Sequence, residues 1–365
     1  MAWSQQQQSA LKAVSAWARD PKAKQIFKLF GYAGTGKTTI AREIEKDIRG
    51  TVLYGAFTGK AALVLRSKGC HNACTIHSMI YKLEDGDSAE PTFEINYDAE
   101  IATAALVIID ECSMVDEELG RDLMSFGTKI LVLGDPEQLP PVRGEGFFTT
   151  GTPDVMLTEI HRQAADNPII RMSMDVREGR RLAPGAYGSS KVITRSDVDR
   201  QEVLTADQIL VGRNKTRRGY NARIRQLKGF DGIFPEVGDR LVCLRNNREK
   251  LLLNGGLWTA KSVNIDSKSV VHMQVTSNDN AGAYGPVDVD VPIEFFKGTE
   301  QTLNWKVRRS MDEFDYGYAL TVHKAQGSQW DHVMLFDESA AFTENRTKHL
   351  YTGLTRAAER VTVVI

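Results

Sequence analysis

The sequence contains few cysteines and no long apolar run. Four cysteines in 365 residues argue against a disulfide framework. Cys70 and Cys74 stand near two histidines, but the spacing fits no standard zinc site, so buried structural thiols are the preferred interpretation. No stretch of about 18 consecutive apolar residues occurs, so no transmembrane helix is expected. The polar segment Met1–Leu11 lacks the features of a signal peptide. We therefore expect a cytoplasmic protein that does not bind a membrane.

Charge of one sign is also lacking. Lys and Arg sum to 46 and Asp and Glu to 47, for a net charge of −1. A chain with this balance can bind nucleic acid only through local basic surfaces, so composition alone does not point to that partner. The hydrophobic content of 42% and the charged content of 25% are typical of a soluble globular enzyme and exclude wholesale disorder. At roughly 100–200 residues per domain, the length predicts two or three domains.

Strand-like runs alternate with helical stretches in the first part of the chain. An amphipathic helix is predicted over 4–20, with Ser4 as its amino-terminal cap. The turn-rich segment 82–98 interrupts the alternation and predicts a small β-hairpin. The remaining pattern predicts a mostly parallel sheet covered by helices. The strands are predicted at 25–30, 51–57, 105–109 and 129–133.

A second unit begins after about residue 153. Residues 235–310 form short strand-like runs separated by turns, which predicts an inserted small β-barrel. The α/β alternation resumes after this segment, so the fold class is α/β with two parallel-sheet domains. The predicted domains are the first at 1–152 with its hairpin at 80–100, the second at 153–234 and 311–365, and the barrel at 235–310.

The segment Gly31–Thr38 matches the phosphate-binding pattern G-x-x-x-x-G-K-[ST] and lies between a predicted strand and a predicted helix. Its glycines let backbone N–H groups point at phosphate oxygens, and the helix adds the positive end of its dipole. We expect Lys37 to reach the β- and γ-phosphates of ATP and Thr38 to bind Mg²⁺. The loop residues predicted to hold ATP are Gly31, Gly34, Thr35, Gly36, Lys37, Thr38 and Thr39.

Polar residues follow two further strands of this predicted sheet. Asp110 and Glu111 come directly after a buried run, where carboxylates face the crevice that binds ligands in such sheets. Asp110 is predicted to bind Mg²⁺, and Glu111 to orient and deprotonate the attacking water. Gln138 follows the next strand and can hydrogen-bond a γ-phosphate or its water. Either feature alone is a common acidic pair or a turn, and the phosphate-binding loop upstream favours the functional interpretation.

Eight blocks of the sequence resemble the superfamily 1 helicases, and most closely the RecD-like and Dda-like branch. They cover nearly the whole chain, from Gln7 to Arg360. The resemblance implies two RecA-like motor domains with ATP in the cleft between them, a hairpin insertion in the first and an SH3-like barrel in the second. It also implies an ATP-hydrolysing DNA helicase that moves 5′ to 3′ on single-stranded DNA. The blocks are GYAGTGKT, AFTGKAA, TIHS, DECSM, GDPEQLPPV, IHRQ, ALTVHKAQGSQW and LYTGLTRA.

The resemblance also implies roles for residues outside the phosphate-binding loop. Gln7 matches the glutamine that reads adenine, and Arg162 and Arg356 match two arginines that reach the γ-phosphate from the second domain. Gln329 stands where many members carry glutamate, which puts ribose recognition in doubt. Phe57 either stacks on a base or packs in the core. The residues that the resemblance places along DNA are Phe57, Thr58, Lys60, Thr75, His77, Thr321, His323 and Lys324.

The expected partners are single-stranded DNA and forked duplex DNA, bound by a monomer of phage or bacterial origin. A single-strand-binding protein and replication or recombination proteins are further candidates, and no long amino-terminal extension is expected to recruit them. Tyr81, Phe93 and Tyr97 are candidates for a wedge that splits the duplex. The basic run Arg213–Arg225 can touch phosphates, but a solvated helix face is favoured. An RNA track, an ATPase of another phosphate-loop class and a strand-binding module with an inactive motor remain open.

Overall fold

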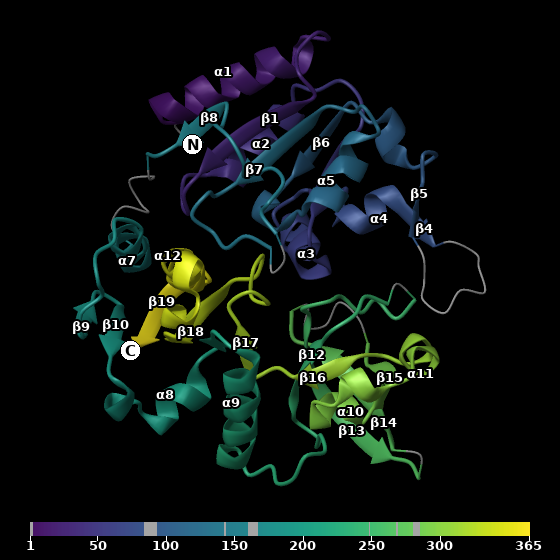
Figure 1. Ribbon diagram of the computed structural model, residues 1–365, viewed down its shortest axis with the longest axis vertical. Helices are drawn as coiled ribbons and strands as arrows, with labels where there is room; N and C mark the ends of the chain where they lie inside the picture. Colours follow the sequence, from purple (N-terminus) through teal and green to yellow (C-terminus); the bar gives the residue numbers. More distant parts are fainter. Residues whose placement is uncertain are drawn as a thin grey trace.

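The computed structural model describes residues 3–83, 93–141, 144–159, 167–247, 249–267, 269–279 and 285–365. The described strands form two six-stranded sheets, one five-stranded sheet and one two-stranded sheet. We call the parts built on the six-stranded sheets the first and second lobes, and the part built on the five-stranded sheet the insertion. Figure 1 shows the first lobe at the top, the second lobe at the lower left and the insertion at the lower right.

The first lobe is built on a parallel sheet in the order β3-β2-β6-β7-β1-β8. The middle strands are continuous runs of buried apolar residues, as expected of parallel strands covered on both faces. β8 pairs with β1, so this sheet extends beyond the predicted domain end at 152. The strands are β1 Ile26–Gly31, β2 Val52–Ala56, β3 Ala73–Thr75, β6 Leu106–Ile109, β7 Ile130–Gly134 and β8 Val155–Leu157.

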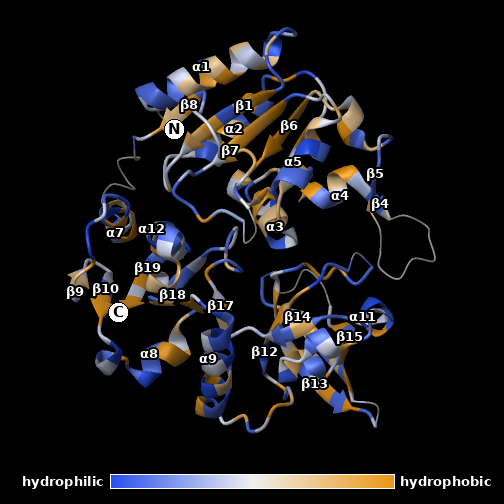
Figure 2. Ribbon diagram, in the orientation of Figure 1, coloured by the Kyte–Doolittle hydropathy of each residue, from blue (hydrophilic) through white to orange (hydrophobic). Residues whose placement is uncertain are grey.

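Helices cover this sheet, and four of the five within the described residues have a polar side-chain cap at the amino-terminal end. Ser4 caps the first helix in a reciprocal arrangement with Gln7, which confirms the predicted cap. Figure 2 shows the hydrophobic colour concentrated in the strands and the hydrophilic colour mostly on helices and loops. No helix among the described residues combines the length and the apolar character needed to cross a membrane. The helices are α1 Gln5–Arg19, α2 Lys37–Glu45, α3 Gly59–Ser67, α4 Ile76–Ile80 and α5 Glu117–Met124.

A short antiparallel pair stands where the hairpin was predicted. β4 Tyr81–Leu83 pairs with β5 Phe93–Ile95, and the residues 84–92 between them lie outside the described part of the chain. Tyr81 donates a hydrogen bond to Asp122 and packs near Phe93, which is 59% exposed. Tyr97 is also exposed and contacts the ring of Phe126. Of the three wedge candidates, Phe93 and Tyr97 therefore have exposed rings, whereas Tyr81 is half-buried.

The second lobe repeats the parallel arrangement in the order β17-β11-β18-β19-β10-β9. All its neighbouring strands are parallel except β9 and β10, which form an antiparallel edge. The strands are β9 Gly185–Tyr187, β10 Ser190–Ile193, β11 Gln208–Val211, β17 Ala319–Thr321, β18 Trp330–Phe336 and β19 Ala357–Val364. The helices are α7 Pro168–Arg177, α8 Arg200–Thr205, α9 Asn214–Leu227 and α12 Arg346–Leu354.

The insertion is an antiparallel sheet in the order β15-β14-β13-β12-β16. Its edge strands do not pair with each other among the described residues, so the sheet is open where a closed barrel was predicted. β16 completes the sheet by pairing with β12, so the insertion extends beyond the predicted end at 310. Its elements are β12 Arg240–Cys243, β13 Leu257–Ile265, β14 Val270–Ser277, β15 Val287–Pro292, α10 Glu294–Lys297, α11 Trp305–Ser310 and β16 Phe314–Tyr316.

The basic helix α9 joins the second lobe to the insertion. Arg217 donates to Asp315 at 2.7 Å, and Arg225 donates to Asp239 at 2.9 Å, with all four side chains largely buried. The prediction of a solvated charged face is therefore wrong for Arg217 and Arg225. At the start of the helix, Glu338 accepts hydrogen bonds from the backbone N–H groups of Gly212 and Arg213. These two residues directly precede the helix, so the distant carboxylate fixes the chain where it enters α9.

Candidate nucleotide site and strand-facing residues

The loop between β1 and α2 is shaped by its glycines. Gly34 and Gly36 have φ angles of 79° and 83°, in the left-handed region where a side chain is unfavourable. A Cβ on Gly31 would lie 2.6 Å from Thr35 Oγ1 and 2.8 Å from the Cβ of Leu157, so no side chain fits there. Gly36 is also the amino-terminal cap of α2, and the first backbone N–H groups of that helix therefore face the loop.

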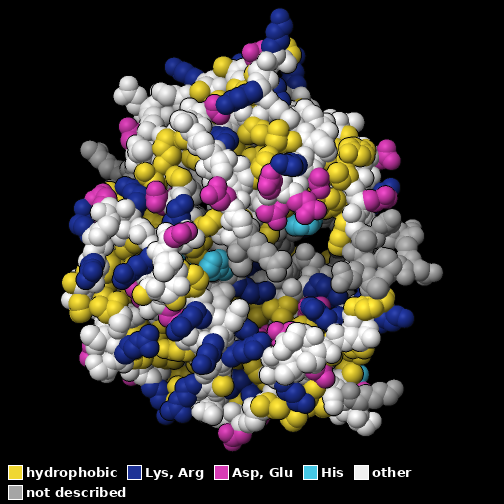
Figure 3. Space-filling view, viewed as in Figure 1, with side chains coloured by type: hydrophobic (Ala, Val, Ile, Leu, Met, Phe, Trp, Pro, Cys, Tyr) yellow, Lys and Arg dark blue, Asp and Glu magenta, His cyan; other side chains and the backbone are white. Residues whose placement is uncertain are grey.

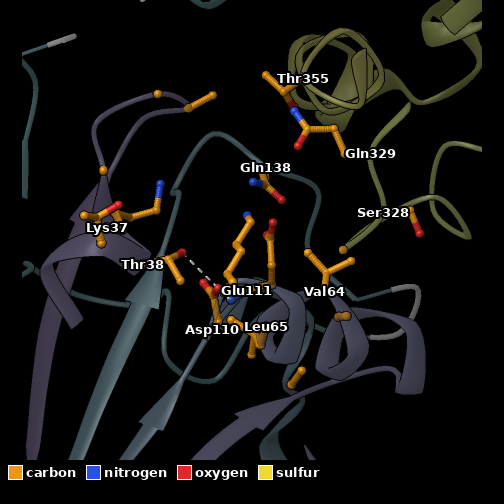
Figure 4. Close-up of a pocket in the computed structure, with 18 of the residues that line it drawn as sticks. Lys37, Thr38, Val64, Leu65, Asp110, Glu111, Gln138, Ser328, Gln329 and Thr355 are labelled. Atoms are coloured by element: carbon orange, nitrogen blue, oxygen red, sulfur yellow. Dashed lines mark hydrogen bonds between the residues drawn. The ribbon is translucent and has the colours of Figure 1, made fainter. Parts of the chain in front are cut away.

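Two polar side chains of the loop region already have partners. Lys37 Nζ donates to the carbonyl oxygens of Gly31 at 2.6 Å and of Tyr32 at 3.1 Å, so the lysine is folded onto its own loop. Thr38 Oγ1 donates to Asp110 Oδ2 at 3.2 Å, as the dashed line in Figure 4 marks. Burial and the neighbouring Glu111 raise the pKa of the Asp110 carboxyl. The hydroxyl and the carboxylate predicted to share a cation are thus adjacent.

A cavity of about 500 Å³ lies between the two lobes. Figure 4 shows Gln329 and Thr355 of the second lobe across the cavity from Lys37 and Thr38 of the first. The first lobe contributes Ala33, Gly34, Gly36, Lys37, Thr38, Thr39, Arg42, Ala56, Ala61, Val64, Leu65, Lys68, Asp110, Glu111 and Gln138. The second lobe contributes Gly327, Ser328, Gln329, Thr355 and Arg356.

The acid and the arginine predicted to act together face each other across this cavity. Arg356 Nη1 lies 3.8 Å from Glu111 Oε1, and the guanidinium donates to the carbonyl oxygens of Thr352 and Ser328. Glu111 has a φ of 53°, a strained value for a residue with a side chain. Gln138 is buried, and its Oε1 has no hydrogen-bond partner among the described residues. A buried acceptor of this kind is costly unless a ligand or water supplies a donor.

Most residues predicted to hold the nucleotide line this one cavity, but three described residues, Gln7, Gly31 and Thr35, do not line it. Arg162 lies outside the described residues. Gln7 is buried and donates through its amide to the Thr35 carbonyl at 3.0 Å, so it braces the loop from behind. The prediction missed two basic residues of the lining, Arg42 on α2 and Lys68 at the end of α3. Both are basic residues on or next to helices that follow the phosphate-binding motif, and this pattern could have identified them.

Three threonines predicted to face DNA cap helices or turns with their side chains. Thr58 Oγ1 accepts from the Ala61 N–H and Thr75 Oγ1 accepts from the Ser78 N–H, each at 3.2 Å. Thr321 is buried and its hydroxyl accepts from the N–H of Lys324 at 3.2 Å. These caps hold the amino-terminal turns of α3 and α4 and the turn after β17 in place.

The two lysines predicted to face DNA both contact the insertion. Lys60 is 5% exposed, and its Nζ lies 3.2 Å from Asp279 Oδ1 and 4.6 Å from the ring centroid of Trp330. Lys324 Nζ donates to Asn254 Oδ1 at 3.1 Å. Burial lowers the pKa of both ammonium groups. In this conformation the insertion covers Lys60, so it does not line an open surface.

An aromatic row runs from the end of β2 to the hairpin. Phe57 and His77 have ring centroids 6.0 Å apart, and His77 and Tyr81 are 5.9 Å apart. The row ends at Phe93, 6.4 Å beyond Tyr81. His77 is exposed, whereas His323 is half-buried beside Phe342 at 5.6 Å. Phe57 is half-buried and joins both the core of the first lobe and this row, so neither predicted role is excluded.

These features define a P-loop nucleotide-binding protein whose cavity is completed by a second lobe. The family model described as an AAA domain matches residues 2–197, and that described as a UvrD-like helicase C-terminal domain matches residues 316–364. The chain therefore belongs to the AAA domain family. The resemblance to superfamily 1 helicases is confirmed.

Several relatives are named as helicases. The ATP-dependent RecD2 DNA helicase of Deinococcus radiodurans is 28% identical over 92% of this chain and 46% of its own length. The ATP-dependent DNA helicase dda of Enterobacteria phage T4 is 33% identical over 41% of this chain and 37% of its own length. The chain thus spans less than half the length of these relatives.

Solved helicase structures share the fold. The structure of Pif1 from Bacteroides with ADP-AlF3 and single-stranded DNA has a TM-score of 0.60 at 18% identity, and covers 99% of this chain and 92% of its own. Pif1 from Candida albicans has a TM-score of 0.57 at 20% identity, and covers 100% of this chain and 94% of its own. At these identities the likeness establishes the fold.

Proposed function

We propose that this chain is an ATP-driven motor that moves 5′ to 3′ along single-stranded DNA and unwinds forked duplex. One observation carries the proposal: two lobes supply one cavity, with Lys37, Asp110 and Glu111 from the first and Arg356 from the second. A cavity divided in this way changes shape when a triphosphate bridges its two walls and again when the γ-phosphate leaves. The relatives named as DNA helicases and the Pif1 structure with single-stranded DNA support the choice of reaction and track.

The residues around Thr38 fit a triphosphate with Mg²⁺. Thr38 Oγ1 and the Asp110 carboxylate are 3.2 Å apart, and hard oxygen ligands of this kind suit magnesium. Thr38 and Asp110 would hold the ion, which neutralises phosphate charge when bound. Lys37 leaves the carbonyl oxygens of Gly31 and Tyr32 to reach the β- and γ-phosphates. The glycine loop offers its N–H groups to the phosphates, and Gln329 faces the remainder of the nucleotide.

Hydrolysis assigns separate tasks to three side chains. Glu111 orients the attacking water and accepts its proton, while Gln138 offers its unpaired Oε1 to the same water. Arg356 exchanges Glu111 for the γ-phosphate and stabilises the charge that develops there. Arg162 is proposed as a second arginine and Gln7 as the residue that reads adenine. Because Gln7 now holds the Thr35 carbonyl, adenine binding would require it to share or exchange that contact.

The track is proposed to cross both lobes beneath the insertion. Thr58, Lys60, Thr75, His77 and Phe57 face it from the first lobe, and Thr321, His323 and Lys324 face it from the second. Figure 3 shows Lys and Arg side chains gathered in the lower half of the view, over α8, α9 and the insertion, and Asp and Glu beside α4 and α5. A strand held by phosphate contacts and base stacking needs no sequence preference.

The sheets support a division into two motor domains and two insertions. We assign the first domain to 1–157, the second to 158–234 and 317–365, and the insertion to 235–316, because β8 pairs with β1 and β16 pairs with β12. The pair β4–β5 is proposed as the wedge that splits duplex, with Phe93 at its surface. The five-stranded insertion is proposed to correspond to the SH3-like module of the family and to hold the strand. Single-strand-binding and replication or recombination proteins are proposed partners of a monomer.

The test measures ATP hydrolysis with poly-dT, with RNA of equal length and without polymer. We expect strong stimulation by poly-dT, and unwinding of 5′-tailed but not 3′-tailed duplexes. Lys37→Ala should abolish turnover while leaving strand binding measurable, and Lys46→Ala at the exposed end of the same helix should match the wild type. Turnover that ignores every polymer would refute the motor, and stimulation by RNA alone would refute DNA as the track.

A further inference from the structure

One tyrosine of the second lobe holds two loops of the first. Tyr351 on α12 is 1% exposed, and its hydroxyl accepts a hydrogen bond from the N–H of Ala33 in the phosphate-binding loop at 3.0 Å. The same hydroxyl donates to Asp135 Oδ2 at 2.6 Å. Its one proton and one acceptor position are thus both used, and both partners lie across the cleft from it.

The Asp135 contact leads to the residue proposed to position water. Asp135 Oδ1 accepts from the N–H of Glu137 at 3.0 Å, and its carbonyl accepts from the N–H of Gln138 at 3.2 Å. Asp135 is 2% exposed, so its carboxylate depends on these partners and on Tyr351 for its solvation. The conformation of the loop that carries Gln138 is therefore tied to a hydroxyl of the opposite lobe.

Neighbouring residues strengthen the same junction. Thr352, next to Tyr351, accepts from the N–H of Leu139 at 3.0 Å, and Gln326 donates to the Leu139 carbonyl at 2.9 Å. The Thr352 carbonyl in turn accepts from Arg356 Nε at 3.2 Å. One turn of α12 thus contacts the loop of Gln138 on one side and the arginine on the other.

We propose that Tyr351 is a positioning residue for ATP hydrolysis: its hydroxyl is the pivot that sets Arg356 and Gln138 relative to the phosphate-binding loop. The inference rests on the proposed function for the reaction itself. Because a displacement of about 1 Å in such a constellation can cost on the order of 100-fold in rate, one buried hydroxyl is sufficient to control it. A contact that merely held the lobes together would instead affect stability alone.

The chain supplies a matched control in Tyr318. Its buried hydroxyl donates to Asp239 Oδ1 at 3.0 Å and accepts from the N–H of Arg240 at 3.1 Å, within the junction of α9 and the insertion. Tyr318→Phe therefore also removes one donated and one accepted hydrogen bond, but at a place away from the cavity. Both variants keep the ring, and both are expected to lower the melting temperature by similar amounts.

The experiment compares kcat and KM for ATP in both variants, with and without poly-dT. Tyr351→Phe should lower kcat by roughly 10- to 100-fold in both conditions and change KM by less than about threefold, because Lys37 is untouched. Tyr318→Phe should keep kcat within about twofold of the wild type. Asp135→Asn should lower kcat as well, and the double variant Tyr351→Phe/Asp135→Asn should lose less than the product of the two losses.

The outcomes distinguish a failure of the positioning role of Tyr351 from a failure of the proposed motor function. A normal kcat in Tyr351→Phe, or equal losses in Tyr351→Phe and Tyr318→Phe, would overturn the pivot. A wild type that hydrolyses ATP but ignores polymers would refute the proposed track, and the comparison without polymer would still test the pivot. A wild type without any turnover would overturn both.

Discussion

Two buried cations of the molecule have opposite surroundings. Arg225 on α9 donates five hydrogen bonds, three to the Asp239 carboxylate and one each to the carbonyl oxygens of Gly232 and Phe234. Lys60 on α3 has one acidic neighbour, Asp279, and its ammonium forms no well-directed hydrogen bond within the described residues. Burial favours the neutral form of both groups. Asp239 outweighs that effect and raises the pKa of Arg225, whereas the pKa of Lys60 is lowered.

The difference separates a structural charge from one that still requires a partner. A buried ion with all its donors matched fixes the geometry of the elements around it, and removing one partner leaves an uncompensated charge. A buried cation with unmatched donors is stabilised when an anion binds to it. Lys60 is such a group, and Asp279, the acid beside it, belongs to the insertion that is proposed to hold the strand.

The largest effect is expected from a substitution that breaks the ion pair between Arg225 and Asp239. Arg225→Met leaves Asp239 buried without its cation and should lower the free energy of unfolding by about 3–5 kcal/mol. Arg223→Met on the same helix removes an exposed arginine and should change it by less than about 0.5 kcal/mol. Urea titration of both variants checks the difference. Equal stabilities would mean that the hydrogen bonds of Arg225 are replaced by water.

His349 is a buried neutral base, and it extends the comparison to the pH dependence of stability. His349 is 1% exposed, both ring nitrogens lack partners among the described residues, and its ring stacks on Phe342 at 4.2 Å. Burial, assisted by His323, lowers the pKa of His349 from 6.5 to about 4. Between these values the unfolded chain binds the proton and the folded chain does not, so acid destabilises the fold. The cost of keeping His349 neutral should reach about 2 kcal/mol at pH 5 and vanish above pH 7.

The measurement isolates this residue by difference. His349→Phe keeps a ring on Phe342 and should lose less stability between pH 8 and pH 5 than the wild type does. His71→Phe replaces an exposed histidine and should follow the wild-type pH curve. If both variants follow that curve, the ring of His349 is protonated in the folded chain, and burial does not keep it neutral.

The local parts of this molecule were predictable, and the long-range pairings were not. The strand at 106–109 and the loop at 31–38 can each be predicted from a few consecutive residues, because a buried parallel strand and a phosphate-binding loop have strict local requirements. Arg223 and Arg225 look alike in the sequence, and only the second faces Asp239. Tyr351 lies 318 residues from Ala33, so no local pattern identifies their contact.

Lys60 itself provides the next test. Lys60→Met should change the free energy of unfolding by less than about 1 kcal/mol, since the poorly matched ammonium stabilises little. The same variant should bind single-stranded DNA about tenfold more weakly and reduce the slope of log affinity against log salt by roughly 0.7, the value of one phosphate contact on a single strand. Lys12→Met, an exposed lysine on α1, should alter neither quantity. An unchanged salt slope would mean that Lys60 does not contact a phosphate of the bound strand.

The smallest effect concerns the acid that covers Lys60. Asp279→Asn removes the charge that competes with a phosphate for the ammonium, and the amide oxygen can still accept the N–H of Leu257. We expect strand affinity to rise by about two- to fivefold, the equivalent of a partly exposed ion pair, and the gain to shrink with added salt. Asp288→Asn on β15 makes the same change of charge at an exposed site and should raise affinity less. Equal gains in the two variants would mean that the effect is one of net charge, and that Asp279 does not compete with DNA for Lys60.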